Sequence, residues 1–267
     1  MFDAALMSSE HHYGNAPCTD ELAENFLTRY NRQFHAQRAD TPELVRNAQA
    51  IRYQVYCLER KFENAAEHGD GLESDSFDAT AVHSLIYHRP SGNAIGTARL
   101  ILPCHAAGGL PVQRLLREKG WNVEDHFPLE TAAEISRFSI SNQFRRRCSE
   151  GLSTGDARHE RETCSVLPCL GLLQDLLRQS VALGLTHLAA VMEPKLLRML
   201  AAMGFHTTAI GPLVFYHGLR QPCYWYLTEA VERLRREQPD HWVVVTNAGS
   251  LVPAEALRHL PAQRRAA

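Results

Sequence analysis

The sequence predicts an α/β protein in which helices cover one mixed β-sheet. Helical and strand-like segments follow one another in the order helix, hairpin, strand, helix, strand, helix, strand, an alternation typical of a layered α/β domain. No G-x-G-x-x-G motif follows a strand, which argues against a dinucleotide-binding fold. The 267 residues contain neither repeats nor a linker rich in Pro, Gly or Ser. We therefore predict one domain over residues 41–230, with an N-terminal extension that contains a helix (1–40) and a C-terminal extension (231–267).

The first elements of the chain are predicted to be two helices. Residues 21–34 carry apolar side chains at helical spacing. Thr41 followed by Pro42 is typical of a helix start, because Thr caps the first free N–H groups and Pro lacks one. Along this second helix Arg52 and Tyr56 lie on the same side, since positions i and i+4 are neighbours.

Strands are predicted to form the middle of the chain. Residues 82–87 and 94–102 are apolar runs separated by the turn 89–93 (Arg-Pro-Ser-Gly-Asn), which indicates a hairpin. A short helix is expected within residues 108–121, and residues 131–141 form the next predicted strand.

The second half is predicted to alternate between helices and short strands. Residues 168–184 form a leucine-rich helix that ends at a glycine. The charge-dense stretch 144–163 is predicted to be a mobile loop, and residues 242–246 receive no assignment. The remaining predicted elements are strands at 187–192, 207–210, 214–216 and 223–227 and helices at 193–203 and 227–237.

Charged residues stand inside segments that are otherwise apolar. Arg99, Glu134 and Arg137 fall within predicted strands, where an unpaired charge is costly. Such charges persist when they neutralise one another or bind a polar substrate. With Arg52, Asp75 and Asp78 nearby in the pattern, three basic and three acidic side chains are available for a closed ionic network.

Composition excludes several classes of function. A net charge of −2 provides no basic surface for nucleic acid. Seven cysteines without a C-x-x-C motif argue against a disulfide framework and against a structural zinc site, so we expect no metal and a reducing, cytoplasmic location. No signal-peptide pattern and no run of roughly 18 apolar residues is present, so no integral membrane segment is expected.

The spaced motifs resemble those of the acyl-homoserine-lactone (autoinducer) synthases and the related N-acyl amino acid synthases, which share the GNAT (GCN5-like acyl-CoA N-acyltransferase) fold. The resemblance extends from about residue 44 to residue 227. The N-terminal helix and the C-terminal tail are more similar to the acyltransferases associated with exosortase and PEP-CTERM sorting systems, which is our leading family assignment. The motifs are Arg52, Tyr56 and Phe62 at the spacing of the family's Arg, Phe and Trp, then Asp75-x-Phe-Asp78, Arg99 in G-x-x-R-L, and Glu134-x-x-Arg137.

The resemblance implies a reaction in which an amine attacks an acyl thioester, with Glu134, Arg99 and Arg137 as the catalytic group. Glu134 either accepts the ammonium proton, directly or through water, or simply pairs with an arginine; both readings can hold together. In a strand with strict alternation, Glu134 and Arg137 point to opposite faces of the sheet. They share a site only if Glu134 stands at the strand's entry or the strand bulges, as the corresponding strand of the resembled fold does.

The resemblance also assigns the substrate-binding residues. Arg52, Tyr56 and Phe62 would form a lid over the amine, although plain core packing explains the two aromatic residues better. Their identities differ from the family's Phe and Trp, which bears on substrate choice. Asp75 and Asp78 would bind a substrate ammonium or anchor the lid to arginine, and we favour anchoring.

The expected acyl donor is an acyl carrier protein rather than coenzyme A. Coenzyme-A-dependent relatives carry a glycine-rich R/Q-x-x-G-x-G/A loop, and residues 145–155 do not match it. Arg145, Arg146 and Arg147 would steer the acidic carrier protein, or else belong to a solvated basic loop. No bound cofactor is expected, and residues 170–203 supply apolar side chains for an acyl tunnel.

The sequence therefore predicts a cytoplasmic N-acyltransferase that moves a medium or long fatty acyl group from acyl carrier protein to an amino acid or related amine. Two alternatives stay open. One is an acyl-homoserine-lactone synthase that uses S-adenosylmethionine, and the other is a non-catalytic acyl-binding or regulatory module.

Overall fold

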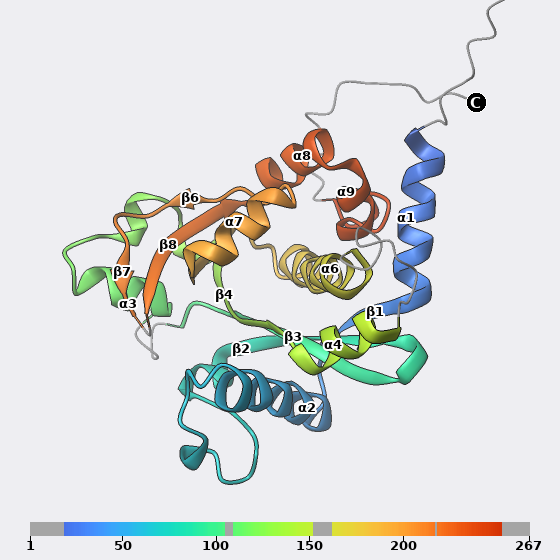
Figure 1. Ribbon diagram of the computed structural model, residues 1–267. Helices are drawn as coiled ribbons and strands as arrows, with labels where there is room; N and C mark the ends of the chain where they lie inside the picture. The colour runs from blue at the N-terminus through green and yellow to red at the C-terminus, as the bar shows by residue number, and fades with distance from the viewer. Residues whose placement is uncertain (1–18, 105–108, 152–161, 217, 253–267) are drawn as a thin grey trace, which may run out of the picture.

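A computed structural model describes residues 19–104, 109–151, 162–216 and 218–252, and its centre is a twisted mixed sheet (Figure 1). The strand order is β1-β2-β3-β4-β5-β8-β6, and the short strand β7 pairs with β8. Every pairing is antiparallel except that of β4 with β5. The strands are β1 (Phe34–Ala39), β2 (Ala81–His88), β3 (Asn93–Ile101), β4 (Ala132–Ile140), β5 (His187–Met192), β6 (Thr208–Ala209), β7 (Val214–Phe215) and β8 (Leu219–Tyr226).

Helices cover both faces of the sheet (Figure 1). One face carries α2 (Pro42–Arg52), its π-helical continuation η1 (Tyr53–Glu59) and the short helix α3 (Pro111–Arg117). The other face carries α6; α9 packs against both α6 and α1, and Tyr30 of α1 donates a hydrogen bond to Gln174 of α6. The helices of that second group and its neighbours are α1 (Thr19–Gln33), α4 (Asn142–Gly151), α6 (Leu167–Ala182), α7 (Pro194–Ala202), α8 (Leu227–Glu237) and α9 (Pro239–Val245).

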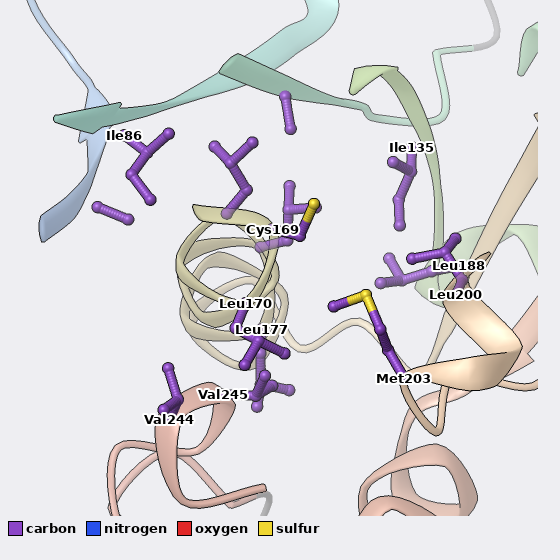
Figure 2. Packing of buried hydrophobic residues seen from close by; sticks show 14 of the residues in the cluster. Ile86, Ile135, Cys169, Leu170, Leu177, Leu188, Leu200, Met203, Val244 and Val245 are labelled. Carbon is purple, nitrogen blue, oxygen red and sulfur yellow. The ribbon is translucent and has the colours of Figure 1, made fainter. Parts of the chain in front are cut away.

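The main apolar core lies between the sheet and α6. Figure 2 shows Ile135 and Leu188 on the sheet side and Leu177 of α6 beside Val245 of α9. Twelve of the sixteen residues of α6 are buried, which is why this helix is apolar on nearly every side. The predicted α/β architecture, with a mixed sheet flanked by helices, is confirmed.

Strand β4 contains a bulge. Thr97 of β3 lies opposite Ser139 and Arg99 lies opposite Ser136, so Arg137 and Phe138 together face the single residue Ala98. Arg137 has φ of 51°, in the left-handed region that favours glycine. The parallel pairing of β4 with β5 covers only residues 132–135 of β4. Beyond that point the two strands no longer pair, which opens a gap in the hydrogen bonding beside the bulge.

Several local predictions are confirmed by the structure. Thr41 caps α2, with its Oγ1 accepting from the backbone N–H of Leu44 at 3.2 Å, and Pro42 is the first helical residue. The hairpin of β2 and β3 turns at Gly92 with φ of 67°. Gly184, with φ of 67°, follows the end of α6. The strand predicted at 187–192 is β5.

Other predictions are wrong or incomplete. The predicted mobile loop 144–163 begins inside helix α4 and ends in a π-helical turn, η7 (Glu162–Val166); residues 152–161 lie outside the described part of the chain. The expectation of no disulfide is also wrong, because Cys148 of α4 is bonded to Cys164 of η7. Charge density misled the interpretation, since Arg146, Arg147 and Glu150 of α4 are exposed to solvent while Phe144 is buried.

Strand β1 and helix α9 were not predicted either. Strand β1 lies in the segment assigned to the N-terminal extension and pairs with β2 along its whole length. Helix α9 occupies the unassigned residues around Trp242. The boundaries at residues 40 and 230 stay predictions. Within the described ranges, no helix is both long and apolar enough to cross a membrane.

Candidate active site

Three arginines and a set of carboxylates form one ion-pair network on the α2 face of the sheet. Arg52 at the end of α2 is fully buried, and Arg99 of β3 is 2% exposed. Arg99 donates to both oxygens of Asp75, with Nη1–Oδ1 at 2.6 Å and Nη2–Oδ2 at 2.9 Å, and also to Asp78. Arg52 donates to Asp78 at 2.7 Å and to Glu73. Asp78 therefore joins two of the arginines.

Arg137 at the bulge is the third arginine of the network. Its Nη2 lies 2.8 Å from Glu73 Oε1, 3.2 Å from Glu63 Oε1 and 3.3 Å from Asp75 Oδ2. Its guanidinium carbon lies 5.2 Å from the centroid of the Tyr56 ring, a cation–π distance. The bulge places this side chain on the α2 face, whereas its neighbours Ile135 and Phe138 pack into the α6-side core.

Glu73, like Glu63, belongs to the network but was missed by sequence reasoning. It is 1% exposed and bridges Arg52 and Arg137. Burial favours its neutral form, but the hydrogen bonds from the two arginines outweigh burial and lower the pKa of Glu73. Glu73 and Asp75 are two residues apart, so on an extended chain their side chains point the same way. That spacing was the available signal.

Asp75 and Asp78 also shape the backbone around themselves. They form a reciprocal cap of the 3₁₀ turn η3 (Ser76–Thr80): Asp75 Oδ1 accepts from the N–H of Phe77 at 2.9 Å, and Asp78 Oδ2 accepts from the N–H of Asp75 at 3.3 Å. Burial alone would raise the pKa of Asp78, but Arg52 and Arg99 lower it to about 2. Both aspartates are thus held as anions beside arginines, and their role as anchors of the lid stays a prediction.

Glu134 stands on the same face but outside the ion pairs, contrary to its predicted place in the network. It is 4% exposed, and its Oε2 accepts from the backbone N–H of Val112, in the first turn of α3, at 2.7 Å. Burial raises the pKa of Glu134 to about 7, although this hydrogen bond and the charge of Arg99 act in the opposite direction. A carboxyl group with this pKa exchanges its proton near neutral pH.

The strand geometry brings the predicted catalytic residues to one face. Glu134 and Ser136 share that face by ordinary alternation, and the bulge adds Arg137. Arg99 Nε donates to Ser136 Oγ at 2.9 Å. This hydrogen bond links β3 to β4 at the residue between Glu134 and Arg137.

The segment after α2 crosses this face as a lid, which we define as residues 53–63. It begins as the π-helix η1, a rare element that is frequent at functional sites. The ring of Phe62 lies 6.4 Å from that of Tyr56 and 5.7 Å from the guanidinium carbon of Arg220 on β8. Phe62 is 37% exposed, whereas Tyr56 is largely covered. The lid therefore extends from α2 to β8.

His83 of β2 lies beneath the network. Its Nε2 is 3.7 Å from Asp78 Oδ1, and neither ring nitrogen has a hydrogen-bond partner among the described residues. Burial lowers the pKa of His83 to about 4. The ring is therefore neutral at physiological pH and adds no charge beside the three arginines.

An apolar cavity of about 60 Å³ lies on the opposite face of the sheet. Ile135 and Leu188 form its floor at the point where β4 and β5 stop pairing. Helices α6, α7, α8 and α9 supply most of the remaining wall, together with Trp225 of β8 and Phe205 after α7. The helical residues are all apolar: Leu173, Leu176, Leu177, Leu200, Leu227, Ala230, Val231, Leu234 and Val245.

The three predicted carrier-docking arginines lie on helix α4 rather than on a loop. Arg146 and Arg147 are exposed, whereas Arg145 is half-buried with a buried Nε. Glu59 of the lid holds the start of α4, accepting from the N–H of Asn142 at 3.0 Å. The helix that carries the arginines is thus tied to the lid. No group of acidic, histidine or cysteine side chains within the described residues is arranged to hold a metal ion.

Comparison with known proteins agrees with this architecture. Residues 51–153 match the family model of the acetyltransferase (GNAT) domain. TofI in a ternary complex with an inhibitor and MTA is 19% identical, with 76% of this chain and 96% of that chain covered and a TM-score of 0.54. Apo TofI gives 19% identity, 76% and 95% coverage and a TM-score of 0.51. FeeM, an N-acyl amino acid synthase from uncultured soil microbes, is 17% identical, with 75% of this chain and 95% of that chain covered and a TM-score of 0.47. No curated protein matches the chain. The fold is that of the GNAT acyltransferases.

Proposed function

We propose that this chain, with its GNAT fold, is an N-acyltransferase that moves a fatty acyl group from a thioester to the amine of an amino acid or a related small molecule. The observation that carries the proposal is Glu134. This buried carboxyl group has a pKa of about 7 and lies beside a β-bulge, at the point where β4 and β5 part. A general base is most effective when its pKa is near the working pH.

The proposed reaction begins with removal of a proton from the substrate ammonium by the Glu134 carboxylate, directly or through one water. The neutral amine nitrogen then bonds to the thioester carbon, and the carbonyl oxygen takes up the negative charge. A backbone N–H at the Arg137–Phe138 bulge is the proposed donor to that oxygen, since a bulge leaves a residue without a ladder partner. Collapse of this intermediate forms the amide and breaks the C–S bond, and the leaving thiolate takes the second proton that the attacking nitrogen gives up.

The ion-pair network supports this chemistry by positioning rather than by proton transfer. Its arginines are each bonded to carboxylates, and its aspartates are held as anions. Arg137 is in addition stacked on Tyr56 of the lid. We propose that the network fixes the lid over the acceptor site, which makes Arg52, Asp75, Asp78 and Glu73 positioning residues.

The apolar cavity is the proposed acyl site. A cavity of about 60 Å³ is small for a medium or long acyl chain, so the leucine side chains around it would move for such a chain to enter. Leucine side chains change rotamers without loss of apolar contact, and α6, α7 and α8 all border the space. The acyl length is therefore proposed to depend on the α8 side of the cavity.

The proposed donor is acyl carrier protein. The stretch before α6 lacks the glycine-rich phosphate loop, and the exposed Arg146 and Arg147 offer positive charge to an acidic carrier. Because the chain continues on both sides of residues 41–230, we also propose the link to exosortase and PEP-CTERM systems. A host with such a system should then accumulate the acylated amine only when this gene is intact.

The test is mass spectrometry of lipids from cells that overproduce the protein, with Glu134→Gln as the matched control. An amide-linked fatty acid present only with the intact protein supports acyl transfer and identifies both substrates. A lactone product identifies an acyl-homoserine-lactone synthase instead. If purified protein, supplied with acyl carrier protein and coenzyme A thioesters and a panel of amino acids, forms no amide, a non-catalytic acyl-binding role replaces the proposal.

A further inference from the structure

An exposed apolar tip marks the end of the molecule that carries β7, and we define it as Leu213, Phe215, Tyr216 and Leu219. These side chains are 47%, 82%, 46% and 52% exposed. They fall within seven residues of one hairpin, because Phe215 of β7 pairs with Leu219 of β8. Soluble proteins seldom gather large apolar side chains at one exposed place without a partner.

Two more exposed aromatic residues adjoin the apolar tip. Trp121, just after α3, is 44% exposed and packs on Gly211, where an added Cβ would lie 3.0 Å from the indole. Phe62 of the lid reaches the same hairpin through Arg220. Figure 1 shows β7 and α3 together at one end of the molecule, away from α1 and α9. Trp121 thus lies beside the chain that enters the hairpin, and Phe62 contacts the hairpin through the guanidinium of Arg220.

We propose that the apolar tip, with Trp121 and Phe62, inserts into the surface of a phospholipid bilayer. Aromatic residues with a polar edge, such as Trp and Tyr, are favoured at the boundary between headgroups and acyl chains. Arg60 and Lys61, exposed next to Phe62, carry positive charge toward anionic headgroups. Arg117 and Lys119 are offset by Glu118 and Glu124 beside them, so the lid supplies the basic contribution.

A bilayer fits the shape of this surface better than a second protein molecule does. A stable protein interface buries about 800 Å² on each partner over a broad, complementary surface. The apolar tip belongs to a hairpin with only two residue pairs, Val214 with Arg220 and Phe215 with Leu219, which offers few side chains to such an interface. A bilayer needs only shallow insertion of a few side chains.

The position of the apolar tip near the candidate active site would help release the product; this part of the inference rests on the proposed function. Tyr216 lies close enough to Glu134 and Arg137 for their charges to affect its pKa, which burial raises. The apolar tip therefore lies near the candidate active site. An N-acylated amine with a fatty chain is poorly soluble in water and would pass directly into the bilayer.

The experiment is sedimentation of the purified full chain with vesicles of phosphatidylcholine, alone or with a minor fraction of phosphatidylglycerol. The test variant is Leu213→Asp/Phe215→Asp. The matched control is Val181→Asp/Leu183→Asp, which replaces two apolar residues at the end of α6 with exposures of 39% and 40%. We expect the tip variant to bind vesicles about tenfold more weakly or worse, and the control to bind like the wild type.

Trp121 provides a second readout. Its fluorescence should shift to shorter wavelength when vesicles are added to the wild type, and Trp121→Phe should abolish that shift while leaving a measurable part of the binding. Equal vesicle binding by the wild type and the tip variant overturns the proposal, as does no binding by the wild type. A dimer that the tip substitutions dissociate would assign the surface to a second copy of the chain.

The two proposals fail independently. Vesicle binding needs no acyl donor and no amine. A wild-type protein that transfers acyl groups but does not bind vesicles therefore overturns only the proposed bilayer surface. Vesicle binding without any acyl transfer overturns only the proposed reaction.

Discussion

Glu134 and Val112 are joined by a hydrogen bond of 2.7 Å from the backbone N–H at the start of α3 to the buried carboxylate. The bond orients the carboxyl group while leaving its pKa at about 7, because burial is the larger effect. A carboxyl group with a raised pKa lowers the stability of the fold at high pH. Measuring stability against pH therefore distinguishes a chemical role of Glu134 from a structural one.

Glu134→Gln should abolish acyl transfer and yet stabilise the fold at pH 8. The pKa of Glu134 is about 7 in the folded protein, above the ordinary glutamate value of 4.5. Between these two pH values the folded protein binds more protons than the unfolded chain does, so stability falls as pH rises through that window. Glutamine stays neutral and can still accept from Val112. Urea unfolding should show a gain on the order of 1–3 kcal/mol at pH 8 and little at pH 4.5. A gain that is the same at both pH values would contradict the raised pKa.

Asp78→Asn should remove much of the acid sensitivity of the fold. The pKa of Asp78 is lowered to about 2 by Arg52 and Arg99 against the effect of burial, so its stabilising contribution is complete above the unfolded pKa and is lost as pH falls toward 2. The wild type should lose stability between about pH 4 and pH 2, and the variant should start lower and fall less. Asp40→Asn, at an exposed position, should behave like the wild type.

Arg137→Gly and Arg137→Ala should differ in stability although both remove the same cation. The left-handed backbone at this residue, φ 51°, costs an alanine about 1 kcal/mol more than a glycine. Glycine should therefore be the milder change in thermal and urea unfolding. At Arg99, which pairs regularly within the ladder, the order should reverse. The same order at both positions would show that the bulge does not carry the strain.

Cys148→Ser/Cys164→Ser should lower the free energy of unfolding by about 3 kcal/mol, the value expected for a closed loop of this length with a separation of 16 residues. A reductant should lower the stability of the wild type and leave the double variant unchanged. Denatured wild type should release two additional thiols on reduction. Cys104→Ser, which removes an unbonded cysteine, should not change the response to reductant. An identical thiol count before and after reduction would exclude the bond.

Ala230→Leu should shift acyl preference toward shorter chains. Ala230 of α8 borders the apolar cavity, and a larger side chain there occupies part of the space proposed for the acyl chain. Competition between thioesters of different length, followed by mass spectrometry of the products, measures the shift. Glu229→Leu adds a similar apolar group one residue away, on the exposed side, and should leave the preference unchanged. Equal profiles for both variants would place the acyl chain elsewhere.

The sequence predicted the architecture because its long elements are strongly periodic. Helix α6 and strand β5 are apolar runs bounded by glycine or polar residues, and the hairpin of β2 and β3 has a distinctive turn. Strand β1 was missed because its residues, Phe-His-Ala-Gln-Arg-Ala, lack β-branched side chains and alternate only weakly. Its pairing with β2 determines its structure, and a local pattern cannot report such a partner.

The sequence predicted most residues of the candidate site but not which of them form ion pairs with one another. All three arginines and both aspartates meet, but Glu73 takes the place in the ion pairs that was assigned to Glu134. Which carboxylate reaches which guanidinium depends on the path of the loop before η3 and on the bulge, and both are tertiary features. The functional roles of these residues stay predictions until the variants are measured.

Helices α1 and α9 lie side by side, with the rings of Phe26 and His241 5.9 Å apart. The first and last helices of the described chain are therefore neighbours. Two helices from opposite ends of the sequence share one core with α6. A circular permutant that joins these helices through a flexible linker and opens at the exposed turn after β2, near Ser91, should therefore fold. In such a permutant the order of synthesis changes while every contact around Glu134 is retained.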